Sequence, residues 1–413
     1  MMTIHVPWRA WYGDTTLAMG FPDGWRVAEY RPDDGPDIGD EAIEAAFDAP
    51  IGARPIEDLA REAVARGNGR VAIAVDDISR PAPTARMLPP LLRRLERAGV
   101  HLDRVRVVLG TGAHRAMTRD DIVKKLGREV ADRLDVHNNN PYDYTADLGV
   151  TSRGTPVRIC RFLADADLKI GVGSITPHGG PGFGGGAKVV VPGCAGIETI
   201  KSMHWPGRLT TGLGRIEGNE LRADIEEMVR DHLKLDWIVN AVVNSRRGIA
   251  GLFVGDLVAA HRAGVALGRR VFATDLPPEP VDVIVCNAYP KDTDFLQHAN
   301  ALNLAHSAPW PLVRPGGTVV VATACPEGRG VHGVYGPGMC YDSLHDRAEG
   351  DDSPRTIWDA PIVTFSPELS ANDVRAGLAF RRWEDLISYL GDLYAQPSVA
   401  VFPCASIQLA RAA

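Results

Sequence analysis

Short runs of apolar, β-branched residues alternate along the chain with longer segments in which apolar positions recur at helical spacing. Leucines recur in this way within residues 84–98. Residues 219–233 are acidic near their start and basic near their end, which complements a helix dipole, so both segments are predicted to be helices. This alternation is typical of an α/β fold with mostly parallel sheets flanked by helices. The apolar runs predict strands at residues 70–75, 105–109, 168–172, 237–243, 281–286, 317–322, 362–365 and 399–402.

Chain length and one proline-rich interruption indicate two domains. A chain of 413 residues is too long for a single compact core. The sequence DLPPEP at residues 275–280 interrupts a helical pattern and precedes a new strand, as an exposed and stiff linker does. We therefore expect an N-terminal domain of residues 1–274 and a C-terminal α/β domain of residues 281–413. Within the first, residues 1–54 carry tryptophans, prolines and short strand-like stretches, which predict an antiparallel flap.

Composition excludes several classes of protein. Apolar residues make up 45% of the chain and charged residues 23%, as in an ordinary soluble globular protein. The net charge of −7, with acids and bases interspersed, argues against nucleic acid and against anionic membranes as partners. Neither a secretory signal nor an apolar run of roughly 20 residues is present, so we expect a cytoplasmic protein. Six cysteines without a CxxC pair fit neither a disulfide framework nor a zinc cluster.

Two candidate sites directly follow predicted strands, where parallel α/β sheets bind ligands. Asp77 and Arg80 lie three positions apart at a strand-to-helix turn, and a guanidinium suits a carboxylate or phosphate. The alternative is a turn with a local surface ion pair. His114, in the sequence GTGAHR, lies where a proton-transfer residue could be presented, or is an incidental neighbour of a glycine turn. Because residue 115 is arginine, no GxGxxG dinucleotide fingerprint is formed.

The most unusual stretch is PHGGPGFGGGAK, which ends at Lys188 and includes Gly184, Gly185 and Gly186. So many glycines have a high entropy cost to order, which favours a functional loop over a merely structural one. Closely spaced backbone N–H groups could cradle a phosphate. However, Val189 follows the lysine, so the Walker pattern GxxxxGK[ST] is not satisfied. A lysine beside bare backbone instead indicates a covalent attachment point or an amine of lowered pKa.

His204 follows Lys188 by sixteen residues. A lone histidine is more often a packed or surface residue than a ligand. The closeness of His204 to the lysine motif makes it a stronger candidate for a metal ligand. Imidazole suits zinc, copper, iron or nickel, whereas magnesium and calcium prefer oxygen. One nitrogen cannot hold such a metal tightly by itself. The other donors would have to come from a bound cofactor.

Taken in order, these motifs resemble the lactate racemase family that uses a nickel-pincer nucleotide, over nearly the whole chain. The specific motifs are DDxxRP from Asp76, GTGxHR from Gly110 and PHxxxGFxGGxK from Pro177. The resemblance implies an active site in the cleft between two domains. It also implies inversion of C2 of a 2-hydroxy acid by reversible hydride transfer. The implied cofactor is pyridinium-3-thioamide-5-thiocarboxylic acid mononucleotide with nickel, made by separate enzymes of the host.

The resemblance also implies roles for the candidate residues. Lys188 would hold the cofactor covalently as a thioamide, with Asp77 and the three glycines also at the cofactor site. His204 would be the protein ligand of nickel. His114 and His178 would be the paired acid/base residues, since inversion needs a base on each face of the substrate carbon. Asp77 would orient a histidine, and Arg80 would bind the substrate carboxylate.

The second domain departs from the lactate-specific pattern. Gln297 stands where the family has a glutamine, but Asn300 replaces a lysine and Leu296 replaces a tyrosine. Loss of the cation should weaken lactate binding, whereas an amide can contact a hydroxyl or another neutral polar group. We therefore expect a larger or differently polar 2-hydroxy acid.

Three alternatives remain. A 2-epimerase of a sugar acid would use the same chemistry, and Asn300 slightly favours it. A non-catalytic carrier of the nickel cofactor would not need both His114 and His178. An NAD-dependent dehydrogenase would need a glycine fingerprint followed by an acidic residue about 20 positions on, and no segment supplies this convincingly.

Overall fold

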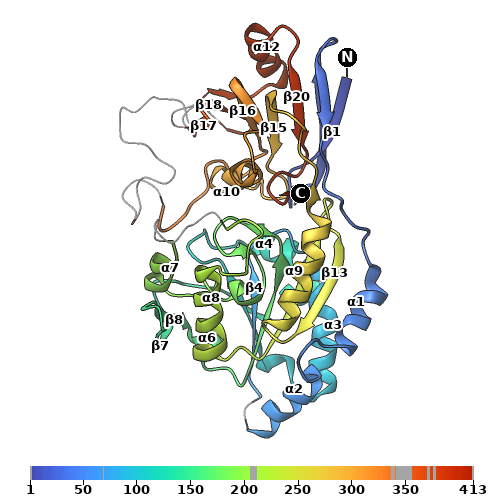
Figure 1. Cartoon of the computed structure of the whole chain (residues 1–413). Coiled ribbons are helices and arrows are strands. Elements are labelled where there is room, and N and C mark those ends of the chain that lie inside the picture. Colours follow the sequence, from blue (N-terminus) through green and yellow to red (C-terminus); the bar gives the residue numbers. More distant parts are fainter. Residues whose placement is uncertain are drawn as a thin grey trace. The chain divides into compact units, whose positions relative to one another are not determined.

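The computed structural model describes residues 2–67, 69–204, 212–335, 340, 356–369, 373–374 and 378–411. The chain forms two compact units. Each is built on a mostly parallel sheet with flanking helices (Figure 1), which confirms the predicted α/β class. Unit 1 comprises Met1–Asp34, Pro177–Gly179 and Val271–Ala413, and unit 2 comprises Gly35–Thr176 and Gly180–Arg270.

The sheet of unit 2 has the strand order β13-β12-β9-β4-β5-β6. Neighbouring strands are parallel, except that β12 and β13 are antiparallel. Every residue of β4 is buried, because both faces of a parallel sheet are covered, and this explains its continuous apolar run. The strands are β4 (Val71–Asp76), β5 (Val105–Gly110), β6 (Asp135–Asn138), β9 (Leu168–Ile175), β12 (Trp237–Val243) and β13 (Ile249–Gly255).

Helices cover both faces of this sheet (Figure 1). The helix predicted at residues 84–98 is present as α3, whereas the one predicted at residues 219–233 is an α-helix, α8, continued by a π-helical turn, η4. The helical elements are α1 (Gly39–Asp48), α2 (Ile56–Ala65), α3 (Thr84–Arg97), η1 (Leu102–Arg104), α4 (Arg119–Leu126), α5 (Arg128–Arg133), α6 (Arg161–Ala164), η2 (Gly186–Val189), α7 (Ile197–His204), α8 (Glu220–Glu227), η4 (Met228–Leu233) and α9 (Ala259–Val271). Strands β7 (Thr145–Val150) and β8 (Pro156–Cys160) form an antiparallel pair, and β11 is Gly182–Phe183.

The main sheet of unit 1 has the order β17-β18-β16-β15-β20-β3, with β19 also paired to β18. Successive residues of its strands serve two different cores. In β15, Val283 and Val285 belong to one core cluster and Ile284 and Cys286 to the other, as the two-residue period of a strand requires. The strands are β3 (Arg26–Glu29), β15 (Val281–Asn287), β16 (Val313–Ala322), β17 (Thr356–Ile357), β18 (Ala360–Phe365), β19 (Leu378–Phe380) and β20 (Ser398–Phe402).

One core of unit 1 is closed by α12 (Trp383–Leu393) and by the antiparallel hairpin of β1 (Met2–Trp8) and β2 (Thr15–Phe21). The other is closed by the helical segment α10 (Phe295–His298), η5 (Ala299–Leu302) and α11 (Asn303–Ser307). The short strands β14 (Ala273–Thr274) and β21 (Leu409–Ala410) pair in parallel, and β10 is Pro177–His178.

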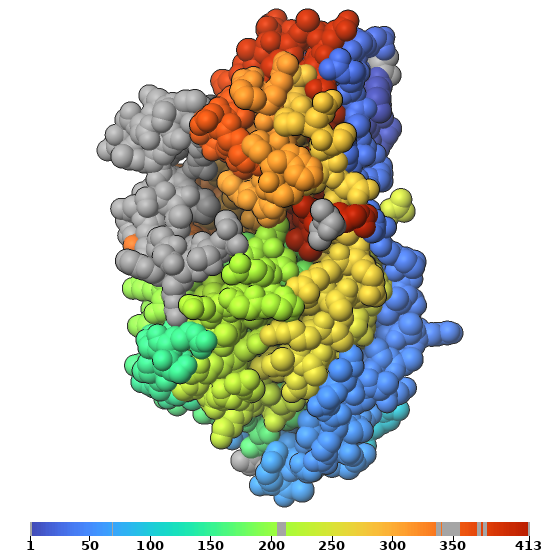
Figure 2. Space-filling model, in the orientation of Figure 1, coloured from blue at the N-terminus to red at the C-terminus, as the bar shows by residue number. Residues whose placement is uncertain are grey.

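The first 54 residues are divided between the two units, whereas the sequence analysis placed residues 1–274 in one domain. The predicted antiparallel flap is present as β1 and β2, but their apolar side chains belong to a core of unit 1, and β3 pairs with β20. Residues 35–54 belong to unit 2, where Ile51 bridges Gly255. Figure 2 shows the blue surface of this N-terminal segment beside the yellow surface of α9. The N-terminal segment is divided between the units because its strands pair with distant parts of the chain, and such pairing cannot be predicted from local sequence pattern.

Candidate active site

The DDxxRP motif lies where β4 ends, at the carboxyl edge of the unit 2 sheet. The buried Asp77 accepts a hydrogen bond from Ser79 Oγ at 2.6 Å, and its Oδ2 lies 2.5 Å from His114 Nδ1. Burial alone would raise the pKa of Asp77, but His114 and the charge of Arg80 outweigh it and lower that pKa well below its usual range. Asp77 is therefore a carboxylate at neutral pH and holds His114 by a charge-assisted contact.

His114 reaches Asp77 because β5 is the immediate parallel neighbour of β4, so the two strands end side by side. The His114 side chain is 19% exposed, against 5% for Asp77. With Nδ1–H donating to the carboxylate, the neutral imidazole carries its lone pair on Nε2. The structure thus brings together two residues that the sequence analysis placed in separate motifs.

The glycine-rich loop packs so closely that its glycines are required for steric reasons. Gly185 and Gly186 have φ of 70° and 57°. A Cβ on Gly185 would lie 2.8 Å from Ile175 Cγ1, and one on Gly186 would lie 2.9 Å from His261 Cδ2. The loop backbone is also held by side chains: His261 Nε2 donates to the Gly184 carbonyl at 2.9 Å, and Gly186 N donates to Asn240 Oδ1 at 2.5 Å.

Arg222 is the largest contributor of donors to this loop, and sequence reasoning did not single it out. It is 1% exposed, and its guanidinium donates to the carbonyls of Pro181 at 3.1 Å and Gly185 at 3.4 Å, and also to that of Phe183. Asn219, the cap of α8, donates to the Gly180 carbonyl at 2.9 Å. The sequence signal that could have identified Arg222 is an arginine in the first turn of a helix that follows a glycine-rich loop.

Lys188 and His204 lie close to this group in unit 2. Lys188 is in η2, directly after the glycines, and His204 is the last described residue of α7. The pKa of His204 is lowered to about 4, mainly by burial and also by the charges of Lys188, His114 and Arg80, against the opposing hydrogen bond to Ile200. Four of the sequence-predicted residues of unit 2 are therefore near enough to interact electrostatically.

The chemistry of His204 fits a soft or borderline metal. Its Nδ1 lies 2.8 Å from the carbonyl oxygen of Ile200, so Nδ1–H is the donor and Nε2 carries the lone pair. A lowered pKa keeps the imidazole neutral, which is the form that ligates metals. The half-buried Lys188 nearby is an amine that a covalent attachment would use. These residues fit a covalently attached, metal-bearing group.

Unit 1 holds the remaining predicted residues. His178 lies in β10, and Pro177 before it accepts a hydrogen bond at 2.9 Å from Lys291 Nζ, a lysine with 0% exposure. Sequence reasoning also missed Lys291. Further along, Asn300 Nδ2 lies 2.8 Å from the Gln297 main-chain carbonyl and 3.3 Å from Gln297 Oε1, so the two side-chain amides are neighbours. Gln297 is buried and Leu296 is half-buried.

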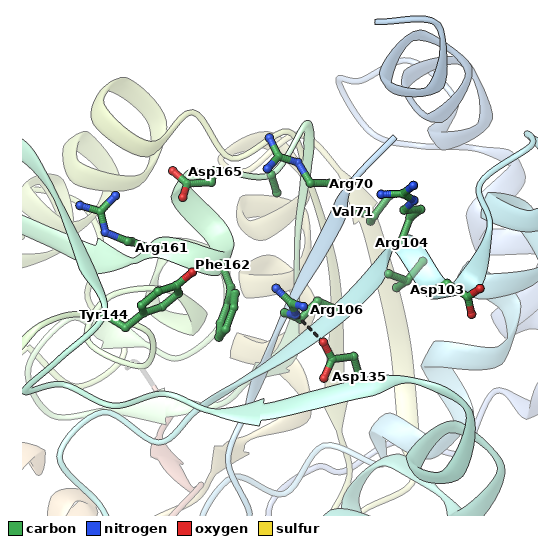
Figure 3. Close-up of a pocket in the computed structure, with 12 residues that line it drawn as sticks. Arg70, Val71, Asp103, Arg104, Arg106, Asp135, Tyr144, Arg161, Phe162 and Asp165 are labelled. Carbon is green, nitrogen blue, oxygen red and sulfur yellow. Dashed lines mark hydrogen bonds and ion pairs between the residues drawn. The ribbon is translucent and has the colours of Figure 1, made fainter. Parts of the chain in front are cut away.

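A separate hollow in unit 2 lies where β4 and β5 begin, at the opposite edge of the sheet (Figure 3). Arg106 in it pairs with Asp135 at 2.6 Å and stacks on Phe162, with Cζ 4.1 Å from the ring centroid. None of the predicted site residues lines it. Its charges are of both signs: the arginines are Arg70, Arg104, Arg106 and Arg161, and the aspartates are Asp103, Asp135 and Asp165.

Within the described part of the chain, the His, Cys, Asp and Glu side chains form no group of three or more that could hold a metal ion. Among the same residues, no helix combines the length and apolar character needed to cross a membrane.

The fold and the grouped ionisable side chains define an α/β enzyme of two units. The model of the lactate racemase N-terminal domain matches residues 12–210. The lactate racemase of Lactiplantibacillus plantarum is 29% identical over 331 residues, 78% of this chain and 73% of the relative. The lactate racemase of Thermoanaerobacterium thermosaccharolyticum is 26% identical over 344 residues, 81% and 77% of the two chains. The domain model and both relatives support the lactate racemase family, which the ordered motifs of the sequence resemble.

Solved structures agree with the fold. The lactate racemase apoprotein from Thermoanaerobacterium thermosaccharolyticum superposes with a TM-score of 0.74 at 20% identity, over 100% of both chains. A protein from Thermotoga maritima gives a TM-score of 0.63 at 17% identity, over 90% of this chain and 98% of the other.

Proposed function

We propose that this protein, an isomerase by its family, is a racemase or epimerase that inverts C2 of a 2-hydroxy acid with a nickel-pincer nucleotide as cofactor. The observation that carries the proposal is the grouping in unit 2. There the Asp77–His114 pair is formed, and the charges of His114, Arg80 and Lys188 all act on His204. An acid/base residue, a carboxylate-binding cation, an attachment lysine and a metal ligand are the parts that this reaction requires.

The residues that would hold the cofactor are Lys188 and His204. Lys188 would carry it through its amine as a thioamide, and His204 would bind nickel through Nε2 while Ile200 fixes the other ring nitrogen. When bound, the cofactor supplies a pyridinium that accepts the C2 hydride and returns it. The backbone of Gly184, Gly185 and Gly186, held by Arg222, Asn240 and His261, would line its site.

His114 is the base for one enantiomer in this proposal. Asp77 holds Nδ1–H, so Nε2 is the atom that takes the hydroxyl proton of the substrate. As the imidazole gains its proton, the carboxylate of Asp77 stabilises the positive charge. Arg80 binds the substrate carboxylate and so fixes which face of C2 is presented.

His178 is the base for the opposite enantiomer. Inversion through a planar 2-keto acid needs a proton acceptor and donor on each side of the carbon, whereas a one-way dehydrogenase needs a single one. The proposal therefore requires both His114 and His178. A cofactor carrier without activity would need neither histidine.

We propose that the substrate is not lactate. Asn300 supplies an amide where a lysine would supply a cation, and it already donates to Gln297. Such a site suits a neutral polar group, as in a longer 2-hydroxy acid. A 2-epimerase of a sugar acid is the second candidate, favoured by the same amides. Measuring kcat/KM across 2-hydroxy acids of increasing length and hydroxylation separates the two, and lactate as the best substrate would contradict both.

The cofactor part is tested by intact-mass spectrometry of the protein co-expressed with cofactor-synthesis enzymes. We expect a mass increment localised to Lys188 by peptide mapping, with nickel present. The variant Lys188→Ala should carry no adduct, whereas Lys201→Ala, which removes a half-buried lysine of α7, should carry the full adduct. An unmodified wild-type protein under these conditions would overturn the cofactor assignment.

A further inference from the structure

Lys125 is a fully buried charge that the proposed reaction does not use. Its side chain is 0% exposed, and its Nζ lies 2.6 Å from Asp76 Oδ1 and donates to the Arg80 carbonyl at 3.0 Å. One ammonium therefore joins the first and the fifth residue of the DDxxRP turn. Burying an ammonium is costly unless it is paired. The complete burial of Lys125 therefore indicates that Asp76 and the Arg80 carbonyl are held in a specific geometry.

The two adjacent aspartates of the turn are held by different partners. Asp76 faces Lys125 and also accepts from Ser174 N at 2.9 Å, whereas Asp77 faces His114 and Ser79. Two of these partners, Lys125 and His114, come from one stretch of chain that begins where β5 ends. That segment therefore holds both aspartates of the turn.

The start of α4 fixes where Lys125 lies relative to His114. Thr118 and Asp121 form a reciprocal capping box, and Arg115 pairs with the same Asp121 carboxylate at 2.7 Å. Lys125 follows Asp121 by four residues, so it lies on the same face of the helix, one turn on. The cap next to His114 thus sets the direction from which Lys125 reaches the turn.

We infer that Lys125 is a positioning residue, which holds the DDxxRP turn so that Asp77 meets His114 and Arg80 points at the substrate. The inference rests on the proposed function for its kinetic part. It predicts that Lys125 acts on both kcat, through His114, and KM, through Arg80, without touching substrate or cofactor.

The test compares Lys125→Met with Arg94→Met in cofactor-loaded enzyme. Arg94 is a matched control: it is 3% exposed, pairs with Glu44 and Asp48 at 2.6 and 2.7 Å, and lies ten residues into α3, about 15 Å along the helix from its start. We expect both variants to lose stability, but only Lys125→Met to lose activity, with a 10- to 100-fold lower kcat/KM shared between kcat and KM. Equal activity in the two variants would overturn the inference.

The double variant Asp76→Asn/Lys125→Met separates positioning from charge balance, and it serves where the single variant does not fold. It removes the unpaired carboxylate, so stability should recover, but the Arg80 carbonyl still lacks its donor and kcat/KM should stay at least tenfold low. Full recovery of activity would show that Lys125 only neutralises Asp76.

A spectroscopic readout keeps this inference distinct from the proposed function. In protein without cofactor, labelled at histidine, the Nδ1 proton of His114 should resonate far downfield because Asp77 accepts it. We expect that signal in wild type and Arg94→Met, and its loss in Lys125→Met and the double variant. A wild type that shows the signal but racemises nothing would refute the function alone, and a signal unchanged in all variants would refute the role of Lys125.

Discussion

The two histidines proposed as bases have different surroundings. In unit 2, the His114 ring is held by the Asp77 carboxylate at 2.5 Å. In unit 1, the preceding residue of His178 is held, since Lys291 donates to the Pro177 carbonyl. A carboxylate fixes the tautomer of a ring and stabilises its cation, and a buried ammonium bonded to the preceding carbonyl fixes where the side chain begins. A carboxylate therefore supports the His114 ring, and a buried lysine supports the main chain before His178.

The largest effect should come from removing either base. His114→Ala and His178→Ala should each lower racemisation by roughly 10²- to 10⁴-fold, the usual contribution of a positioned acid or base. In single turnovers each variant should still oxidise one enantiomer to the 2-keto acid, and the two variants should prefer opposite enantiomers. If both variants lost oxidation of the same enantiomer, the two-base comparison would be wrong. Unchanged turnover in either variant would contradict the proposed mechanism.

Asp77→Asn should weaken only one member of the pair. Without the carboxylate the His114 ring loses its preferred tautomer, so we expect roughly 10²-fold slower oxidation of the enantiomer that His114 serves. Oxidation of the other enantiomer should change little. Single-turnover rates with each pure enantiomer measure this difference, and equal losses for both would mean that Asp77 acts on the site as a whole. Lys188→Ala, analysed beside it, shows the rate without attached cofactor.

The proposed substrate-contact residues of unit 1, Leu296, Gln297 and Asn300, should respond to charge. Asn300→Lys introduces the cation that the family resemblance implies at this position, so kcat/KM for lactate should rise about tenfold, equivalent to about 1.4 kcal/mol. Asn303→Lys places the same charge one turn further along the helical segment and serves as the control. An equal gain in both variants would indicate a long-range field and not a specific contact.

The smallest effects concern stability, and they should have opposite signs in the two units. Asp292 of unit 1 accepts N–H groups of Arg9 and Ala10, yet burial raises its pKa from 3.8 to about 6. Its folded state binds the proton more tightly, so stability is lost as pH rises from about 4 to about 6. Asp77 has a lowered pKa, so its contribution is present at neutral pH and lost as pH falls below about 4.

Urea unfolding as a function of pH checks this contrast. Asp292→Asn should flatten the profile between pH 4 and 6, by on the order of 2 kcal/mol, and Asp77→Asn should flatten it below about pH 4. A profile of Asp292→Asn that still falls between pH 4 and 6 would assign that slope to another group.

The sequence predicted best what depends on local pattern. The buried strands read as apolar runs because both faces of a parallel sheet are covered, and each predicted strand is present with small shifts at its ends. Asp77 and His114 were candidates because each follows a predicted strand, and the pairing of β4 with β5 makes them neighbours.

What the sequence did not predict depends on contacts between distant segments. Nothing in the polar helix RDDIVKKL distinguishes the buried Lys125 from the exposed Lys124 beside it. The assignment of Pro177–Gly179 to unit 1 depends on partners such as Lys291, more than a hundred residues away. The change from α-helix to π-helix after Glu227, where η4 begins, likewise has no local marker such as proline or glycine.

The hydrogen bonds to the carbonyls of the glycine-rich loop have a consequence for how the protein matures. Because Arg222, Asn219 and His261 already satisfy them, the loop obtains its shape during folding and not from a guest molecule. Under the proposed function, a newly made chain would then be ready to bind the cofactor, and its loading would be limited by encounter and bond formation. A shortage of the proposed cofactor would leave folded, inactive protein that regains activity once supply resumes.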